Sequence, residues 1–221
     1  MRGKFVPFAV NVSASEATEI VRPFLSLAEK LGALFLGLCE QLPENVNINF
    51  AGEIGGYDNK ITELSALKGL FSASGETVSF VNAFSVAENQ GVNINATNTT
   101  DSLDYLNTIT ISGGGHAIAG TVVGLKGEHR IIMVDDHTVD IPPSEHMVVL
   151  RNDDRPGVIG KVGTILGENQ INITDMNVGR SVDGYGALMV ISTQNAVSET
   201  VAEHLINTEG VTQCSIINLP M

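Results

Sequence analysis

The segment of this chain best suited to bind a small ligand is residues 151–157, RNDDRPG, between a predicted strand and a predicted helix. A proline has the fixed φ that suits the first turn of a helix, and a glycine lets the backbone approach a ligand closely. The backbone N–H groups of Gly157, Val158 and Ile159 are then expected to be free at the positive end of the helix dipole. Such a helix start favours a carboxylate.

Three side chains near this bend supply the other polar groups that an amino acid requires. Asn152 and Asp154 lie two residues apart in the predicted loop, and Asn172 begins the next predicted strand. A carboxylate accepts hydrogen bonds from an ammonium group, and an amide can form a hydrogen bond with a hydroxyl group. We therefore expect a small amino-acid site, with Asn172 supplied by the same subunit or by a paired one. The alternative is that Asp154 only caps the helix, as aspartate often does.

A second glycine-containing motif lies inside the same predicted helix. Gly157, Gly160 and Gly163 follow a strand and open a helix, as in a dinucleotide-binding loop. The tight G-x-G turn and the acidic residue of that fingerprint are missing. We expect Gly160 and Gly163 to allow close packing of the helix on the sheet.

The remaining polar motifs are better explained as turns than as catalytic groups. The glycines at 113–115 are not followed by Lys-Ser/Thr, which indicates a hairpin turn and not a phosphate cradle. Asp135, Asp136 and His137 are predicted to form a polar turn, because neighbouring strand residues face opposite sides and coordinate a metal poorly together. No Ser-His-Asp or Cys-His arrangement can be assigned, so we predict no catalytic residue and no metal site.

Residues 1–142 are predicted to form a mixed α/β domain. Apolar residues recur at three- and four-residue steps over 20–38 and 61–73, which predicts two long helices, and a short helix is expected at 83–89. Strict alternation predicts a strand at 45–50, and further strands are expected at 78–81, 92–96, 105–111, 116–123, 130–134 and 138–141. Two prolines at 142 and 143 favour an extended connector and mark the boundary.

Residues 143–221 predict a second, smaller domain. The expected strands are 147–150, 172–179, 187–192 and 211–217, and the expected helices are 157–168 and 198–207. The order βαββαβ is that of a ferredoxin-like fold, with both helices on one face of a four-stranded sheet. The fold class of the chain is therefore α/β, or more strictly α+β, with a mixed sheet in the first domain.

Composition narrows the range of partners. With 12 Lys and Arg against 25 Asp and Glu, the net charge of −13 argues against nucleic acid and anionic membranes. Two cysteines, Cys39 and Cys214, fit a reducing compartment. The most apolar run, residues 31–39, is far shorter than the ~20 residues of a membrane-spanning helix, and no signal-peptide pattern follows the first residues. We expect a cytoplasmic protein.

The sequence resembles a known pair of regulatory domains. The stretch NDDRPGVIGKVGTILGENQINITDMNVGR resembles an ACT domain, the amino-acid-sensing βαββαβ module. The pieces VRPFLSLAEKLGALFLGL, LSALKGLF, FVNA, AGTVVG and PPSEHM are similar to the allosteric substrate-binding (ASB) domain of long-form D-3-phosphoglycerate dehydrogenases. Together these pieces span nearly the whole chain in the order found in that family.

This resemblance implies a regulatory function. The family oxidises 3-phosphoglycerate with NAD, and L-serine inhibits it by binding between paired ACT domains. The resemblance places the effector contacts on Asn152, Asp154 and Asn172, although many relatives have His or Tyr in place of Asn152. It implies a homo-oligomer, no cofactor in this chain, and NAD in a catalytic domain outside it. The alternative is a ligand-independent oligomerisation region of the same enzyme.

A second, weaker site is implied at the border of the two domains. Some relatives bind substrate or phosphate there, and Arg130 matches one basic position of that site, with Lys126 close in sequence. Pro142 occupies another of the basic positions. Arg130 is equally well explained as a solvated strand residue.

Overall fold

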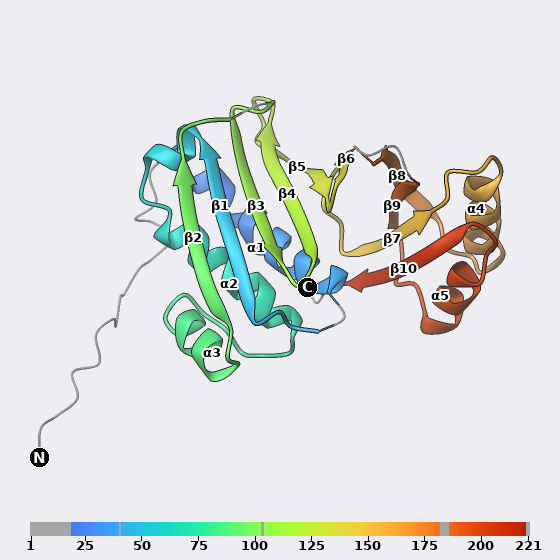
Figure 1. The fold of residues 1–221 in the computed structure, drawn as a ribbon, viewed down its shortest axis with the longest axis horizontal. Coiled ribbons are helices and arrows are strands. Elements are labelled where there is room, and N and C mark those ends of the chain that lie inside the picture. Colours follow the sequence, from blue (N-terminus) through green and yellow to red (C-terminus); the bar gives the residue numbers. More distant parts are fainter. Residues whose placement is uncertain (1–18, 40, 103, 182–185, 220–221) are drawn as a thin grey trace, which may run out of the picture.

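The computed structural model describes residues 19–39, 41–102, 104–181 and 186–219. In these residues the strands form two sheets, one of six strands in the order β2-β1-β3-β4-β5-β6 and one of four in the order β10-β7-β9-β8. The two sheets lie side by side, and the chain crosses from the first to the second between β6 and β7 (Figure 1). The prolines at 142 and 143 lie in this crossing.

Helices cover one face of the six-stranded sheet. α1 (Arg22–Leu38) begins with a proline in its first turn and packs along α2 (Lys60–Ala73). Both lie behind the strands in Figure 1, and α3 (Ala83–Asn89) lies near the start of β2. The apolar spacing that predicts these helices places Leu27, Leu31 and Phe35 fully inside the core.

The six-stranded sheet is mixed, as predicted. β1 (Asn45–Gly52) is parallel to β2 (Asn93–Thr99) and antiparallel to β3 (Asn107–Gly113). The sheet continues antiparallel through β4 (His116–Val123), β5 (Glu128–Val134) and β6 (His137–Ile141). A short 3-10 helix, η2 (Glu53–Gly56), follows β1.

The predicted strand at 78–81 is wrong. In the structure these residues form a turn that leads into α3. The side chain of Asn82 fixes the turn, because its Oδ1 accepts hydrogen bonds from the backbone N–H of Ser79 at 2.6 Å and from the Ser79 hydroxyl at 3.0 Å. An asparagine that bonds to nearby backbone in this way competes with strand formation.

The second domain has the predicted ferredoxin-like fold. Its elements are β7 (His146–Asn152), α4 (Val158–Glu168), β8 (Ile173–Arg180), β9 (Ala187–Thr193), α5 (Glu199–Ile206) and β10 (Val211–Asn218). All neighbouring strands are antiparallel. One core lies between the sheet and the helices, and Val148, Leu150, Val162, Leu166 and Leu205 are among its members.

The other face of the four-stranded sheet is buried against the first domain. The side chains of Met147, Leu188, Val190 and Ile217 belong to the same core cluster as α1 and the six-stranded sheet. Gly37 of α1 has no side chain where it meets β10, and a Cβ there would lie 2.8 Å from the side chain of Ile217. The two domains therefore share one continuous apolar core.

None of the helices in the described ranges is long and apolar enough to span a membrane.

Candidate functional site

The bend at residues 151–157 connects β7 to α4, and Asn152 holds its first half in place. The expectation that Asn152 belongs to the loop is wrong, because it is the last residue of β7 and only 6% exposed. Its Nδ2 donates to the carbonyl of Ala187 at 3.1 Å, and its Oδ1 accepts from the backbone N–H of Asp154 at 3.0 Å. Both polar atoms of Asn152 thus bind within the chain, which fixes the direction in which the loop leaves the sheet.

The second half of the bend requires left-handed backbone. Asp154 has φ +55°, and Gly157, the N-cap residue of α4, has φ +95°. The N-cap residue of α4 is Gly157 and not Asp154, and this glycine has no side chain that could bond to the first turn. The helix starts one residue later than predicted. The prediction that the backbone N–H of Val158 is free is wrong, because it donates to the carbonyl of Arg155 at 3.4 Å. Ile159, next in the first turn, is 48% exposed.

Gly157→Ala is expected to destabilise the chain by about 1–2 kcal/mol, because a residue with a Cβ pays this cost in left-handed backbone. No atom lies within 4 Å of a Cβ built at Gly157, so the cost arises from the backbone and not from a clash. Urea unfolding followed by circular dichroism measures it.

Gly160→Ala is the matched control, since this position is helical and also open. Here alanine is expected to stabilise by about 0.5–1 kcal/mol. Equal effects of the two substitutions would show that the positive φ at Gly157 is unimportant.

Asn172 lies at the other end of the sheet from the bend. It precedes β8, whose first residue, Ile173, is paired with Thr193 at the end of β9. Asn152 is paired with Ala187 at the start of β9. Because a strand rises about 3.3 Å per residue, the two ends are separated by roughly 20 Å. The structure therefore does not bring Asn172 to the bend of the same subunit, which leaves the paired-subunit alternative.

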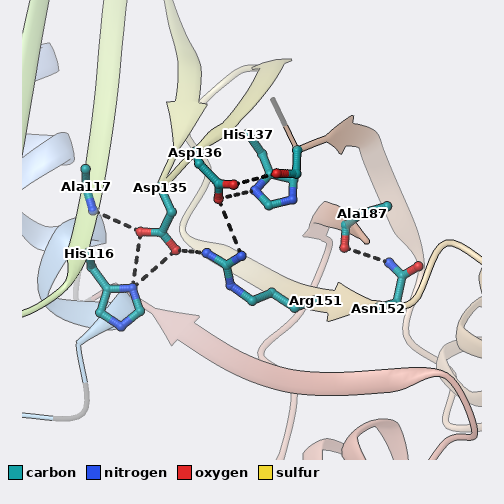
Figure 2. Close-up of polar contacts among 9 residues, drawn as sticks. His116, Ala117, Asp135, Asp136, His137, Arg151, Asn152 and Ala187 are labelled. Atoms are coloured by element: carbon teal, nitrogen blue, oxygen red, sulfur yellow. Dashed lines mark hydrogen bonds and ion pairs between the residues drawn. The ribbon is translucent and has the colours of Figure 1, made fainter. Parts of the chain in front are cut away.

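The residue beside Asn152 joins the two domains. The guanidinium of Arg151 in β7 binds the carboxylate of Asp135, in the turn between β5 and β6 of the first domain (Figure 2). Asp135 has φ +52°, and its Oδ1 accepts from the backbone N–H of Ala117 at 2.9 Å and lies 3.2 Å from His116 Nδ1. Asp135 is thus held by β4 on one side and by β7 on the other.

The neighbouring carboxylate extends this cluster. Asp136 Oδ1 lies 3.6 Å from Arg151 Nη1 and 2.8 Å from His137 Nδ1, and Asp136 Oδ2 accepts from the Ser181 hydroxyl at 2.6 Å. The Ser181 hydrogen bond, together with His137 and Arg151, lowers the pKa of Asp136 below its ordinary value. The predicted polar turn is confirmed at 135–136, whereas His137 is the buried first residue of β6. The sequence does not reveal the contact with Arg151, because Arg151 lies beyond the domain boundary.

The predicted anion site falls in a hollow at the domain junction. Its volume is about 360 Å³, and its lining includes Arg130, Lys30, His129 and the prolines at 142 and 143. Lys126 is not part of this lining. Lys30 of α1 is part of it, and the sequence did not indicate this because Lys30 lies about 100 residues before Arg130. Burial and then Lys30 lower the pKa of His129, so its ring is less readily protonated. Arg130 also lies 3.5 Å from Asp140, and anion binding here stays a prediction.

The acidic, histidine and cysteine side chains that the structure describes form no group of three or more suited to a metal ion. Burial raises the pKa of both Cys39 and Cys214 to about 11, and for Cys39 the charge of Asp135 adds to the effect. Such thiols are poor nucleophiles at neutral pH.

The fold and the bend define a class of protein. It is a ferredoxin-like ACT module, and the sheet face that its helices do not cover is packed on a mixed α/β domain. Comparison with known proteins agrees, since residues 146–210 match the ACT domain. Residues 20–135 match the D-3-phosphoglycerate dehydrogenase intervening domain. The chain belongs to this intervening-domain family, and it corresponds to the regulatory region of D-3-phosphoglycerate dehydrogenases.

Relatives of the chain carry that enzyme name in both bacteria and archaea. The D-3-phosphoglycerate dehydrogenase of Mycobacterium leprae is 32% identical over 225 residues, that of Bacillus subtilis 29% over 225, and that of Archaeoglobus fulgidus 30% over 227. Each match covers 99% of this chain and 43% of the relative. The chain thus spans less than half the length of these relatives.

Proposed function

We propose that this chain is the effector-sensing region of a D-3-phosphoglycerate dehydrogenase, and that it binds L-serine, or a similar small amino acid, between paired ACT domains. The observation that carries the proposal is the bend after β7, where left-handed Asp154 and Gly157 lead into the first turn of α4. NAD-dependent oxidation of 3-phosphoglycerate would take place outside this chain. Serine would then control that activity by feedback.

The position of Asn172 supports a site shared by two subunits. β8 is the last strand of its sheet. β6 packs against it and bridges to Ser181 just beyond its end, and the edge before that bridge could pair with a second copy. If two β8 strands pair antiparallel across a two-fold axis, the start of one strand meets the end of the other. Asn172 of the partner subunit then lies at the end of the sheet that carries the bend. A ligand between the subunits would meet Asp154 from one side and this amide from the other.

The surface beside β8 is suited to such pairing. Met176 and Val178 of β8 are 39% and 38% exposed, and by register they lie on the same face as the buried Ile191 and Met189. Exposed apolar side chains of this kind often mark an interface. The expectation that Gly160 and Gly163 pack the helix closely on the sheet is wrong, because nothing lies within 4 Å of a Cβ built at either position. With Gly167 they leave open space along α4, although glycine inside a helix costs stability. This space is consistent with close approach of a second helix.

The contacts of Arg151 and Asn152 provide a path from the site to the first domain. Asn152 fixes the bend, and the residue before it in β7, Arg151, binds Asp135. A ligand shifts the equilibrium between two arrangements of the pair only through a difference in affinity for them. In this proposal, serine favours one arrangement, and Arg151 transmits it to the first domain.

Asp154→Ala is expected to weaken L-serine binding at least tenfold, because it removes the acceptor for the ammonium group. Isothermal titration calorimetry measures this, with D-serine as the stereochemical control. Asp101→Ala, an exposed aspartate of the first domain, is the matched variant and should bind as the parent chain does.

Two results would refute the proposal. One is the absence of heat at millimolar L-serine, and the other is equal affinity of the Asp154→Ala chain. Sedimentation velocity with and without serine tests the alternative, because a ligand-independent oligomerisation region would not respond to serine.

A further inference from the structure

The first domain has a hollow that the proposed effector site does not use. It has a volume of about 390 Å³, and its lining comes from the carboxyl-terminal halves of the parallel strands β1 and β2 and from the start of α2. The carboxyl ends of parallel strands are a common position for ligands in α/β sheets. Phe50 and Ala96 contribute an apolar floor, and the polar lining includes Asn59, Lys60, Glu63 and Asn98.

A buried carboxylate is the main charged group of this hollow. The side chain of Glu63 is only 9% exposed, and its carboxylate lies 3.0 Å from the ammonium of Lys60. Lys60 Nζ also lies 3.8 Å from the ring centroid of Phe84. Removing a carboxylate from water is costly unless a cation compensates for it. The carboxylate of Glu63 therefore already binds one ammonium group, that of Lys60.

The amide of Asn59 adds an acceptor that lacks a donor. Asn59 is 5% exposed, and its Nδ2 donates to the carbonyls of Ile54 and Tyr57 and, at 2.8 Å, to Oδ1 of Asn98. Because all three partners are acceptors, the orientation of the amide is fixed. Its Oδ1 is buried and has no hydrogen-bond partner among the described residues. An unpaired buried acceptor costs about 1–3 kcal/mol, which a donor would relieve.

We propose that this hollow binds a small molecule through a protonated primary amine. An ammonium group brings three donors and a positive charge, which complements Glu63 and the unpaired amide oxygen of Asn59. Asp58 also lines the hollow, so the lining contains two carboxylates and one lysine, and this balance disfavours an anion. The site lies in the intervening domain and is independent of serine binding by the ACT domain.

Two-dimensional ¹H–¹⁵N NMR of the full chain, titrated with ethanolamine, tests the proposal. We expect saturable shifts of the amides of residues 57–63 and 96–98, and no such shifts with 1,2-ethanediol, which lacks the amine. Glu63→Gln should weaken ethanolamine binding at least tenfold. Glu29→Gln is the control. Glu29 also pairs with a lysine, since its carboxylate lies 2.7 Å from Lys68 Nζ, but this pair is not part of the lining of the hollow. The substitution should leave ethanolamine binding unchanged.

A second variant keeps the proposal testable if the substitution at the buried Glu63 prevents folding. Asn98 is exposed at the rim, so Asn98→Ala should fold and yet bind ethanolamine more weakly, because it disturbs the amide that orients Asn59. The proposal is overturned if no saturable shift appears in the parent chain. It is also overturned if Glu63→Gln, shown to be folded by its spectrum, binds ethanolamine as the parent does.

Discussion

Arg151→Met is expected to lower the free energy of unfolding of this chain by about 2 kcal/mol and to broaden or split its unfolding transition. Methionine keeps the length and the apolar stem of the side chain but leaves the carboxylate of Asp135, which is 10% exposed, without its cation. Breaking a buried ion pair costs about 3–5 kcal/mol, and the 30% exposure of Arg151 reduces that figure. Urea unfolding and scanning calorimetry measure the two effects.

Arg155→Met is the matched control for this prediction. Arg155 pairs with Asp153 at 2.9 Å but is 68% exposed, and an exposed pair contributes about 0–1 kcal/mol. The double variant Asp135→Asn with Arg151→Met should recover part of the loss, because it no longer buries an unpaired charge. Equal effects of Arg151→Met and Arg155→Met would show that the contact between the domains is as weak as an ordinary surface pair.

The local periodicity of the sequence was sufficient to predict most of this fold. The alternation of Val46, Ile48 and Phe50 and the helical spacing through Leu27, Leu31 and Phe35 place these side chains in one core. Each element carries its own apolar face, and this face determines both its type and its side toward the core. The segment 78–81 departs from this rule because the Asn82 side chain bonds to Ser79, a local contact that hydrophobicity does not report.

The contacts of the candidate site depended on tertiary structure that no local pattern contains. The loop sequence predicts polar groups near a helix start, but not that Asn152 turns inward to bind Ala187, 35 residues away. Likewise, Asp135 and Asp136 appear as a polar turn until the second domain brings Arg151 to them. The separation of Asn172 from the bend follows from the register of β7, β9 and β8, which places the two at opposite ends of the sheet.

Val178→Glu is expected to abolish self-association through the ACT domain and, with it, at least nine-tenths of the L-serine binding. In the proposed pairing, Val178 lies on the edge strand β8 within the interface, so one substitution places two carboxylates there, one from each subunit. Each chain already has a net charge of −13, which adds to this repulsion. Sedimentation velocity measures the association state, and calorimetry measures serine binding on the same samples.

Leu125→Glu provides the control for charge and for loss of exposed apolar surface. Leu125 is fully exposed in the turn between β4 and β5 of the first domain, which belong to a different sheet from β8. This variant should associate and bind serine as the parent chain does. If Val178→Glu is monomeric yet binds serine with unchanged affinity, the site lies within one subunit and the shared-site proposal fails. If it remains associated, the pairing uses another surface, and the partner's Asn172 no longer has a route to the bend.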